Sequence, residues 1–291
     1  MAATNLSYQF KSASILVKLI VVNAIVFLIA SLGSFILGMS PSYFSRWFVL
    51  SDDLNTILFQ PWTLISYGFL HFDFFHILFN MVWLYWFGQF VLNLFTGKRL
   101  LTVYMLGALF GGLLFVLAYN LFPVFEEHRG YLIGASGAVT AIMVFIATYT
   151  PNTEFRIFTF TIKLWHIALF LFLLDLVRIP SSGNAGGLLA HVGGGVFGYI
   201  YAVQLAKGND IGKWFENFID WITNFFKPQT KKPFRKVHRT PHSSPKPSKS
   251  KGQKSEYQKK VDTILDKISK SGYESLTKAE KDFLFKAGKE E

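Results

Sequence analysis

The chain has 291 residues, of which 51% are hydrophobic and 16% are charged, whereas an ordinary soluble domain carries about 25% charged residues. This composition, with a mean hydropathy of +0.34, argues against a soluble enzyme. The absence of cysteine excludes disulfides, cysteine nucleophiles, thiolate-bound metals and iron–sulfur clusters. The net charge is +11, and the tract 227–260 alone holds 12 basic residues against Glu256. Because this tract follows an apolar body, it favours a membrane surface over nucleic acid as its partner.

Six segments are predicted to be membrane-spanning helices, because each offers roughly the length of apolar chain that a bilayer core requires. They are residues 15–37, 74–95, 100–121, 134–150, 157–177 and 185–206. The first has no clear small-residue cleavage site, so we interpret it as a span and not as a signal peptide. An even number of spans puts both termini on one side of the membrane.

The distribution of basic residues predicts that this side is the cytoplasm. Six basic residues would lie on it before the tail is counted, against three on the other side. The inner set is Lys11, Lys18, Lys98, Arg99, Arg156 and Lys163, and the outer set is Arg46, Arg129 and Arg178. Lys163 is ambiguous, because it falls within the fifth predicted span.

Two further segments are too apolar for ordinary loops. Residues 38–73 are broken by Ser, Asp and Pro, so we expect an outer loop that is partly embedded, with Trp47 and Trp62 at headgroup depth. Residues 207–226 carry an apolar helical stripe that includes Phe215 and Phe218. We interpret them as an interfacial amphipathic helix on the inner face, with a helix packed on protein as the alternative.

The C-terminal third divides into a linker and a small module. Residues 227–255 are rich in Lys, Ser, Pro and Thr, which predicts a disordered linker, and the charge of residues 227–260 favours anionic inner-leaflet lipid. Residues 256–291 are expected to form a helical hairpin. Gly272 can end its first helix, and Thr277 with Glu280 forms a capping box for the second.

Polar side chains stand near the start of the second, fourth and sixth predicted spans. His76 and Asn80 are four residues apart and share a helix face, Ser136 lies in a first turn, and His191 follows one turn into its helix. In the predicted topology all three spans run from outside to inside, so these side chains lie at a similar shallow depth. We therefore predict a single site that water reaches from the outer side.

Glycines accompany these polar residues. Gly134 and Gly137 flank Ser136, while His191, Gly194 and Gly198 share one face of the sixth span. Small residues let neighbouring helices approach closely, so we predict that these glycines pack helices together at the site.

The polar residues include all the parts of a serine hydrolase. Ser136 is the candidate nucleophile and His191 the candidate general base. Asn80, His76 and the backbone N–H of Ser136 are candidate donors to the oxyanion. No acidic third member is evident, because Asp73 is expected to cap a helix and Asp175 to pair with Arg178, so we predict a Ser–His dyad.

Two non-catalytic alternatives remain open at this point. A single serine or glycine in a membrane span is usually a packing residue, and a polar set could instead line a transporter or channel. The shortage of charged residues at mid-membrane depth and the lack of a visible inverted repeat count against coupled transport.

The three motifs HFDFFHILFNMVW, GASGA and AHVGGGVFG, in this order over residues 10–206, resemble those of the rhomboid intramembrane serine proteases. The resemblance implies a six-helix all-α membrane bundle in a bacterial cytoplasmic membrane, with transmembrane proteins as substrates. It implies a Ser136–His191 dyad, an oxyanion hole of His76, Asn80 and the Ser136 amide, and no cofactor. The fifth span and the following loop would form a substrate gate. A catalytically silent rhomboid-like binder is the alternative function.

The sequence departs from the family pattern at two positions. Trp62-Thr63 stands where many members have Trp-Arg, and Thr140 stands where many have a tyrosine that stacks on the catalytic histidine. The first leaves the anchoring of the outer loop open, and the second leaves the support of His191 open. The segment 256–288 resembles small C-terminal modules on rhomboids of Bacteroidetes-like bacteria, which assigns no activity to it.

Overall fold

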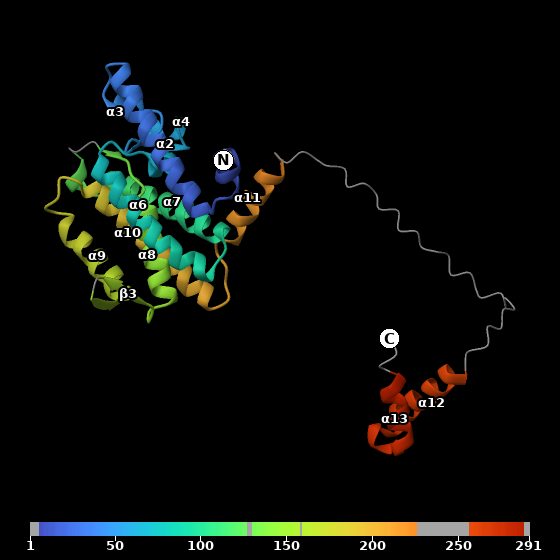
Figure 1. Ribbon diagram of the computed structural model, residues 1–291. Coiled ribbons are helices and arrows are strands. Elements are labelled where there is room, and N and C mark those ends of the chain that lie inside the picture. Colours follow the sequence, from blue (N-terminus) through green and yellow to red (C-terminus); the bar gives the residue numbers. More distant parts are fainter. Residues whose placement is uncertain (1–5, 127–129, 158, 226–255, 288–291) are drawn as a thin grey trace. The chain divides into compact units, whose positions relative to one another are not determined.

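The computed structural model describes residues 6–126, 130–157, 159–225 and 256–287 (Figure 1). Contacts divide the chain into two units, Met1–Pro228 and Gln229–Glu291, and each is described by itself. The first unit is a helical bundle with two short two-stranded sheets, and the second is a pair of helices. The expected all-α architecture is therefore confirmed.

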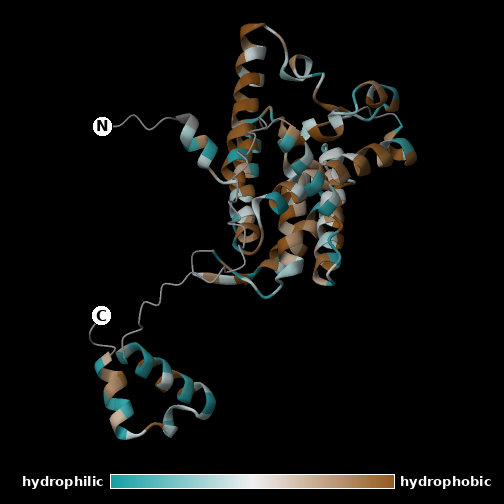
Figure 2. Ribbon diagram, turned by 90° about the vertical axis from the view of Figure 1, so that its right-hand side faces the viewer, coloured by the Kyte–Doolittle hydropathy of each residue, from teal (hydrophilic) through white to brown (hydrophobic). Residues whose placement is uncertain are grey.

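Six helices make up the body of the first unit. They are α2 (Ile15–Ile36), α6 (Phe74–Leu94), α7 (Gly97–Leu121), α8 (Ser136–Tyr149), α9 (Leu164–Arg178) and α10 (Ala185–Ala206). By length and composition α2, α6, α7 and α10 can cross a membrane, while α8 is apolar but has only 14 residues. Figure 2 shows the hydrophobic colouring of these helices. The exact number of spans remains a prediction.

The fifth predicted span, residues 157–177, is wrong in its first third. Strands β3 (Glu154–Ile157) and β4 (Phe160–Lys163) form an antiparallel hairpin, and only then does α9 begin (Figure 1). Polar and apolar residues alternate in both strands, which is the period of a strand and not of a helix. Lys163 therefore ends β4 and lies outside the helix.

Helices α8 and α10 are in contact through their backbones. A Cβ atom added at Gly194 would lie 2.1 Å from the carbonyl oxygen of Gly137, and one added at Gly198 would lie 2.3 Å from that of Ala141. A Cβ atom at Gly137 would lie 3.1 Å from the Ala190 oxygen. Only glycine permits this approach, which holds the start of α8 against α10.

Two buried tyrosines join residues 67–68, which belong to the predicted outer loop, to helix α7. The Tyr67 hydroxyl donates to the Ala108 carbonyl at 2.6 Å, and the Tyr104 hydroxyl donates to the Gly68 carbonyl at 2.8 Å. Asn23 of α2 in turn donates to the Tyr104 hydroxyl at 3.1 Å. These bonds satisfy polar groups that would otherwise be costly to bury.

Residues 38–73, the predicted outer loop, fold into short elements. They are α3 (Pro41–Phe44), β1 (Leu50–Ser51), α4 (Leu54–Phe59), α5 (Thr63–Ser66) and the 3-10 turn η1 (Tyr67–Phe69), and β1 pairs with β2 (Tyr131–Leu132). The Trp62 indole donates to the Trp47 carbonyl at 2.7 Å, and the Thr63 hydroxyl to the Gln60 carbonyl at 2.6 Å. These two hydrogen bonds hold the segment in place although position 63 is a threonine. Its depth in a membrane remains a prediction.

Helix α11 (Lys213–Phe225) packs on the protein by one face. Arg99 of α7 donates to Glu216 at 2.8 Å and to Asp210 at 2.6 Å, and Phe215 is buried beside them. The opposite face exposes aromatic side chains, namely Trp214, Phe218, Trp221 and Phe225. One face of this helix therefore packs on the protein, and its position at a membrane surface remains a prediction. The short α1 (Leu6–Ser12) and η2 (Pro123–Phe125) complete the unit.

The second unit consists of α12 (Glu256–Ser271), η3 (Tyr273–Ser275) and α13 (Lys278–Ala287). Gly272, with φ at +77°, follows α12. The predicted capping box is confirmed, because Thr277 donates its N–H to Glu280 at 2.7 Å and Glu280 returns one at 3.4 Å. The predicted linker, residues 227–255, and most of the basic tract lie outside the described residues.

Candidate active site

A cavity of about 410 Å³ lies between α6, α8, α9 and α10. His76, Asn80, Ser136 and His191 all line it, so the structure brings together the four predicted polar residues. They come from α6, α8 and α10, the helices of the second, fourth and sixth predicted spans. The remaining wall includes the aromatic side chains of α6 and, on α9, Leu171 and Asp175.

Ser136 is the first residue of α8. Its backbone N–H therefore has no carbonyl one turn earlier to accept it and is available to a ligand. Gly134, two residues before, has φ at +111°, and its N–H donates to the Tyr67 carbonyl at 3.0 Å. A Cβ atom at Gly134 would lie 2.7 Å from the His76 ring. Gly134 thus lies outside the helix and makes room for His76, which differs from the expected role in helix packing.

His76 and Asn80 are held by the start of α6. Asp73 accepts the His76 N–H at 2.7 Å, which confirms Asp73 as the cap of this helix. The Asn80 side-chain amide donates to the His76 carbonyl at 3.0 Å and lies 3.3 Å from His71 Nε2. Both amide hydrogens of Asn80 therefore have acceptors within the chain. Donation from Asn80 to an oxyanion would require it to release one of them.

His71 is a site residue that the sequence analysis missed. It is fully buried, and its Nε2 accepts the backbone N–H of Ala135 at 3.3 Å in addition to the Asn80 amide. Burial lowers the pKa of His71 from 6.5 to about 3, so the ring is neutral, with its proton on Nδ1. His71 thus holds the residue before Ser136. Its position five residues before His76 was the one available signal, but five is not a same-face helical spacing.

Asp175 of α9 is the second missed residue. Its carboxylate lies 2.8 Å from Nδ1 of His191. The predicted pair of Asp175 with Arg178 is wrong, because α9 lies beside α10 and turns Asp175 toward the cavity. Both partners are only partly buried, with side-chain exposures of 17% for Asp175 and 22% for His191. The two residues lie on different helices, so no spacing rule within one helix finds this contact.

Within the described part of the chain, no hydrogen bond joins the Ser136 hydroxyl to His191, and no aromatic ring stacks on His191. Hydrogen bonds between a nucleophile and its base often tighten only when substrate is bound. Thr140 lines the cavity, and the polar contact of His191 is with Asp175. Among the described residues, no group of three or more His, Asp or Glu side chains could hold a metal ion.

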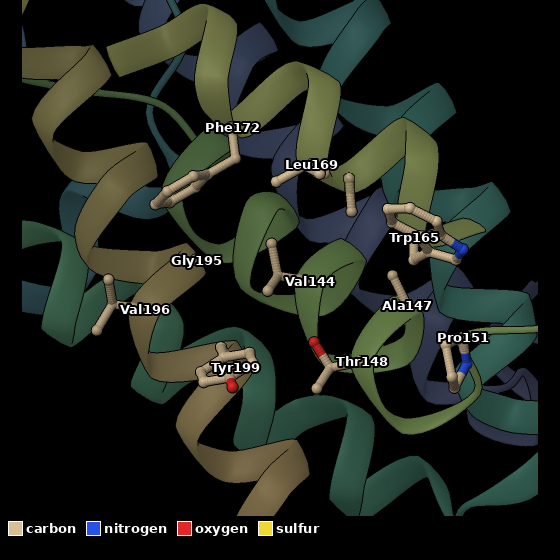
Figure 3. Close-up of a pocket in the computed structure, with 11 residues that line it drawn as sticks. Val144, Ala147, Thr148, Pro151, Trp165, Leu169, Phe172, Gly195, Val196 and Tyr199 are labelled. Atoms are coloured by element: carbon tan, nitrogen blue, oxygen red, sulfur yellow. The ribbon is translucent and has the colours of Figure 1, made fainter. Parts of the chain in front are cut away.

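A second cavity, of about 580 Å³, borders a neighbouring face of α9 (Figure 3). Trp165, Leu169 and Phe172 of α9 face it, together with Val144 of α8 and Tyr199 of α10. Its lining is almost entirely apolar, so it lacks groups for acyl transfer. Helix α9 therefore borders two cavities, one polar and one apolar.

Comparison with known proteins finds a family match in each unit of the chain. Residues 58–208 match the Rhomboid domain family, and residues 249–287 match a family of unknown function (DUF6576). The chain is 32% identical over 158 residues to "RHOMBOID-like protein 12, mitochondrial" of Arabidopsis thaliana, covering 50% of this chain and 47% of the relative. It is 33% identical over 157 residues to "Rhomboid protease GlpG" of Yersinia enterocolitica, covering 51% and 49%.

The chain thus spans about half the length of the curated relatives that it matches. The matched domain includes every residue of the polar cavity, from Asp73 to His191, and covers more than half of the chain. Together with the apolar helical bundle, this match identifies an integral membrane protein of an intramembrane protease family. The chain belongs to the rhomboid family.

Proposed function

We propose that this protein is an intramembrane serine endopeptidase with Ser136 as nucleophile and His191 as general base. The observation that carries the proposal is the shared cavity, in which the first residue of α8 meets His191 of α10 and the polar residues of α6. An exposed backbone N–H at a helix start, beside a serine and a histidine, suits the stabilisation of an acyl-transfer oxyanion.

In the proposed reaction, Ser136 Oγ bonds to the scissile carbonyl carbon while its proton passes to Nε2 of His191. The carbonyl electron pair moves to the oxygen, which the Ser136 N–H, His76 and Asn80 would stabilise. The C–N bond then breaks, and His191 gives its proton to the leaving amine. A water molecule, deprotonated by His191, hydrolyses the acyl-enzyme and restores Ser136.

The proposed substrates are transmembrane helices of other proteins, cleaved near the outer membrane face. Phe79 and Trp83 of α6 and Leu171 of α9 give the cavity an apolar side, which suits a helix that arrives from the lipid. The proposed setting is the bacterial inner membrane with both termini in the cytoplasm. The basic residues Lys98 and Arg99 at the start of α7 would then lie on the inner side.

A fluorophosphonate probe on the purified detergent-solubilised protein tests this proposal. Intact mass should show stoichiometric labelling of the wild type and none of Ser136→Ala or His191→Ala. Ser34→Ala is the matched control, because Ser34 is buried in α2, donates to the Ser31 carbonyl at 3.0 Å and does not line the cavity. Labelling of Ser136→Ala at the wild-type level would contradict the assignment.

Asn80→Ala should weaken the activity without abolishing it. Removal of one oxyanion donor typically lowers the rate by about 10²–10³. Because both Asn80 amide hydrogens already have acceptors, we expect the lower end of this range, about 10². Cleavage of a reconstituted transmembrane substrate measures the effect, and an unchanged rate would remove Asn80 from the proposed oxyanion hole.

A catalytically silent rhomboid-like binder is the second candidate, favoured by the lack of a Ser136–His191 hydrogen bond among the described residues. Such a protein would bind transmembrane helices with equal affinity before and after Ser136→Ala. Failure of two serine-directed probe classes to label the folded wild type would support this candidate and contradict the protease.

We also propose that residues 227–260, most of which lie outside the described residues, bind the anionic inner leaflet. Each basic residue near such a surface contributes about 1 kcal/mol at moderate ionic strength. A peptide of residues 207–260 should bind vesicles with anionic lipid more tightly than neutral vesicles, and salt should reduce the difference. Equal binding to both would contradict this proposal.

A further inference from the structure

The His191–Asp175 contact joins two helices that are otherwise linked by apolar packing. The distance from Asp175 Oδ2 to His191 Nδ1 is 2.8 Å. Within the described part of the chain, this is the only side-chain hydrogen bond from α9 to another helix. A neighbouring face of α9 borders the apolar cavity in Figure 3, and among the described residues no hydrogen bond joins α9 to another helix across that cavity.

A neutral imidazole has one N–H and one acceptor nitrogen, and the partner of one nitrogen decides which it is. A carboxylate accepts only, so Nδ1 must carry the proton that it shares with Asp175. Nε2 is then the unprotonated nitrogen. That is the form in which His191 can remove the hydroxyl proton of a serine in the same cavity.

We propose that Asp175 is a positioning residue that holds His191 with its proton on Nδ1 and its Nε2 ready as the base. This inference rests on the proposed function and replaces the predicted Ser–His dyad by a set of three. The carboxylate would also stabilise the imidazolium that forms when His191 accepts the Ser136 proton. Since both side chains are partly exposed, water screens part of that stabilisation.

Other charged groups near the pair do not offer Nδ1 an alternative acceptor. Asp73 and His76 line the cavity from α6, but among the described residues no hydrogen bond joins Asp73 to His191, and the Asp73 carboxylate accepts the His76 backbone N–H at 2.7 Å. Arg178 of α9 is exposed and does not line the cavity. From α8 the cavity wall contributes Ser136 and Thr140, which are uncharged. Asp175 is therefore the carboxylate that faces His191.

Three substitutions on the full-length protein test the proposal. Asp175→Asn keeps the shape, but an amide N–H can donate to Nδ1 and so favours a proton on Nε2, the unsuitable form. Asp175→Ala leaves His191 with no side chain that favours a proton on Nδ1 or on Nε2. Asp175→Glu keeps a carboxylate at this position. Arg178→Gln, a charge removal on the same helix, is the matched control.

The first readout is the rate constant of fluorophosphonate labelling at saturating probe, separated from probe affinity. We expect Asp175→Asn to lower this rate constant by about 10²-fold with unchanged affinity, and Arg178→Gln to leave it unchanged. Asp175→Ala should be less impaired than Asp175→Asn, and Asp175→Glu should recover part of the rate. A merely structural role gives the reverse order for Asn and Ala, and that order would overturn the proposal.

The second readout does not depend on activity. In ¹⁵N-histidine NMR spectra, assigned by loss of a signal in His191→Gln, His191 should be protonated at Nδ1 in the wild type and at Nε2 in Asp175→Asn. An unchanged tautomer would overturn the proposal even if the protease is active. If the tautomer shifts as expected but the wild type is not labelled, the positioning role stands and the proposed protease function fails.

Discussion

Helices α8 and α9 both border the polar cavity, but they are held in different ways. Helix α8 lies against α10 at backbone distance, with Gly194 and Gly198 facing carbonyl oxygens of α8. Helix α9 buries only Leu164 and Ala168, and it borders two cavities. In Figure 1 it lies at the edge of the bundle beside the β3–β4 hairpin.

The rigid contact of α8 and the loose packing of α9 suit two different requirements of the site, namely fixed catalytic residues and a helix that can move. A nucleophile and its base need fixed positions, because a misplacement of about 1 Å can cost two orders of magnitude in rate. Backbone contacts between α8 and α10 meet that demand, since neither side can rotate away. A helix that borders open space can move at little cost in packing, and α9 brings only Asp175 to the polar group.

Of the substitutions that test this difference between α8 and α9, Gly194→Ala should have the largest effect on stability and labelling. Its Cβ atom would lie 2.1 Å from the Gly137 carbonyl oxygen, so α8 and α10 must separate. We expect a loss of stability of about 2 kcal/mol or more, even after the gain in helix propensity, and loss of probe labelling. Thermal unfolding in detergent measures the first. Gly183→Ala is the control, because nothing lies within 4 Å of its Cβ position. Equal midpoints for the two variants would contradict the rigid interface.

His71→Phe should have an intermediate effect on the same rigid side. The ring shape is kept, but the Ala135 N–H and one Asn80 N–H lose their acceptor inside the protein. An unsatisfied buried donor costs about 1–3 kcal/mol, and the residue before Ser136 becomes less well held. We expect a lower unfolding midpoint and slower labelling of Ser136. The exposed His166 on α9 provides the control substitution His166→Phe, and a similar loss in both variants would refute the role of His71.

Gly195→Ala, one residue from Gly194, should have the smallest effect. Its Cβ atom would meet the Phe172 ring at 3.0 Å, and that ring borders the 580 Å³ cavity into which it can turn. The helix propensity gained by alanine, up to about 1 kcal/mol, offsets the adjustment. We expect an unfolding midpoint close to that of the wild type. A loss as large as that of Gly194→Ala would show that α9 is packed as firmly as α8.

Much of the fold followed from local pattern. The apolar lengths of α2, α6, α7 and α10 and the cap at Asp73 are properties of neighbouring residues, so they were predictable. The β3–β4 hairpin was missed because a short apolar stretch with few charges satisfies a membrane-span criterion as well as a strand pattern. The polar residues that meet in the cavity were predictable because topology placed them at one depth.

The two missed residues, His71 and Asp175, show that a sequence pattern does not predict contacts between residues on different elements. His71 stands in a turn before α6, and it accepts from Ala135, which is 64 residues later in the chain. Asp175 has a plausible local partner three residues away in Arg178, and only the position of α9 beside α10 turns it to His191 instead. For both residues, several hydrogen-bond partners were chemically acceptable, so the sequence did not indicate which one the fold selects.

The sequence by itself determined the membrane-embedded helical architecture, the family and the set of polar residues near the N-terminal ends of three helices. These depend on hydrophobic length, helical period and motif order, which are local quantities. Only the tertiary structure decided that His71 supports the residue before Ser136 and that Asp175 faces His191. The physical reason is that a hydrogen bond needs a donor and an acceptor within about 3 Å, and packing between helices sets that distance.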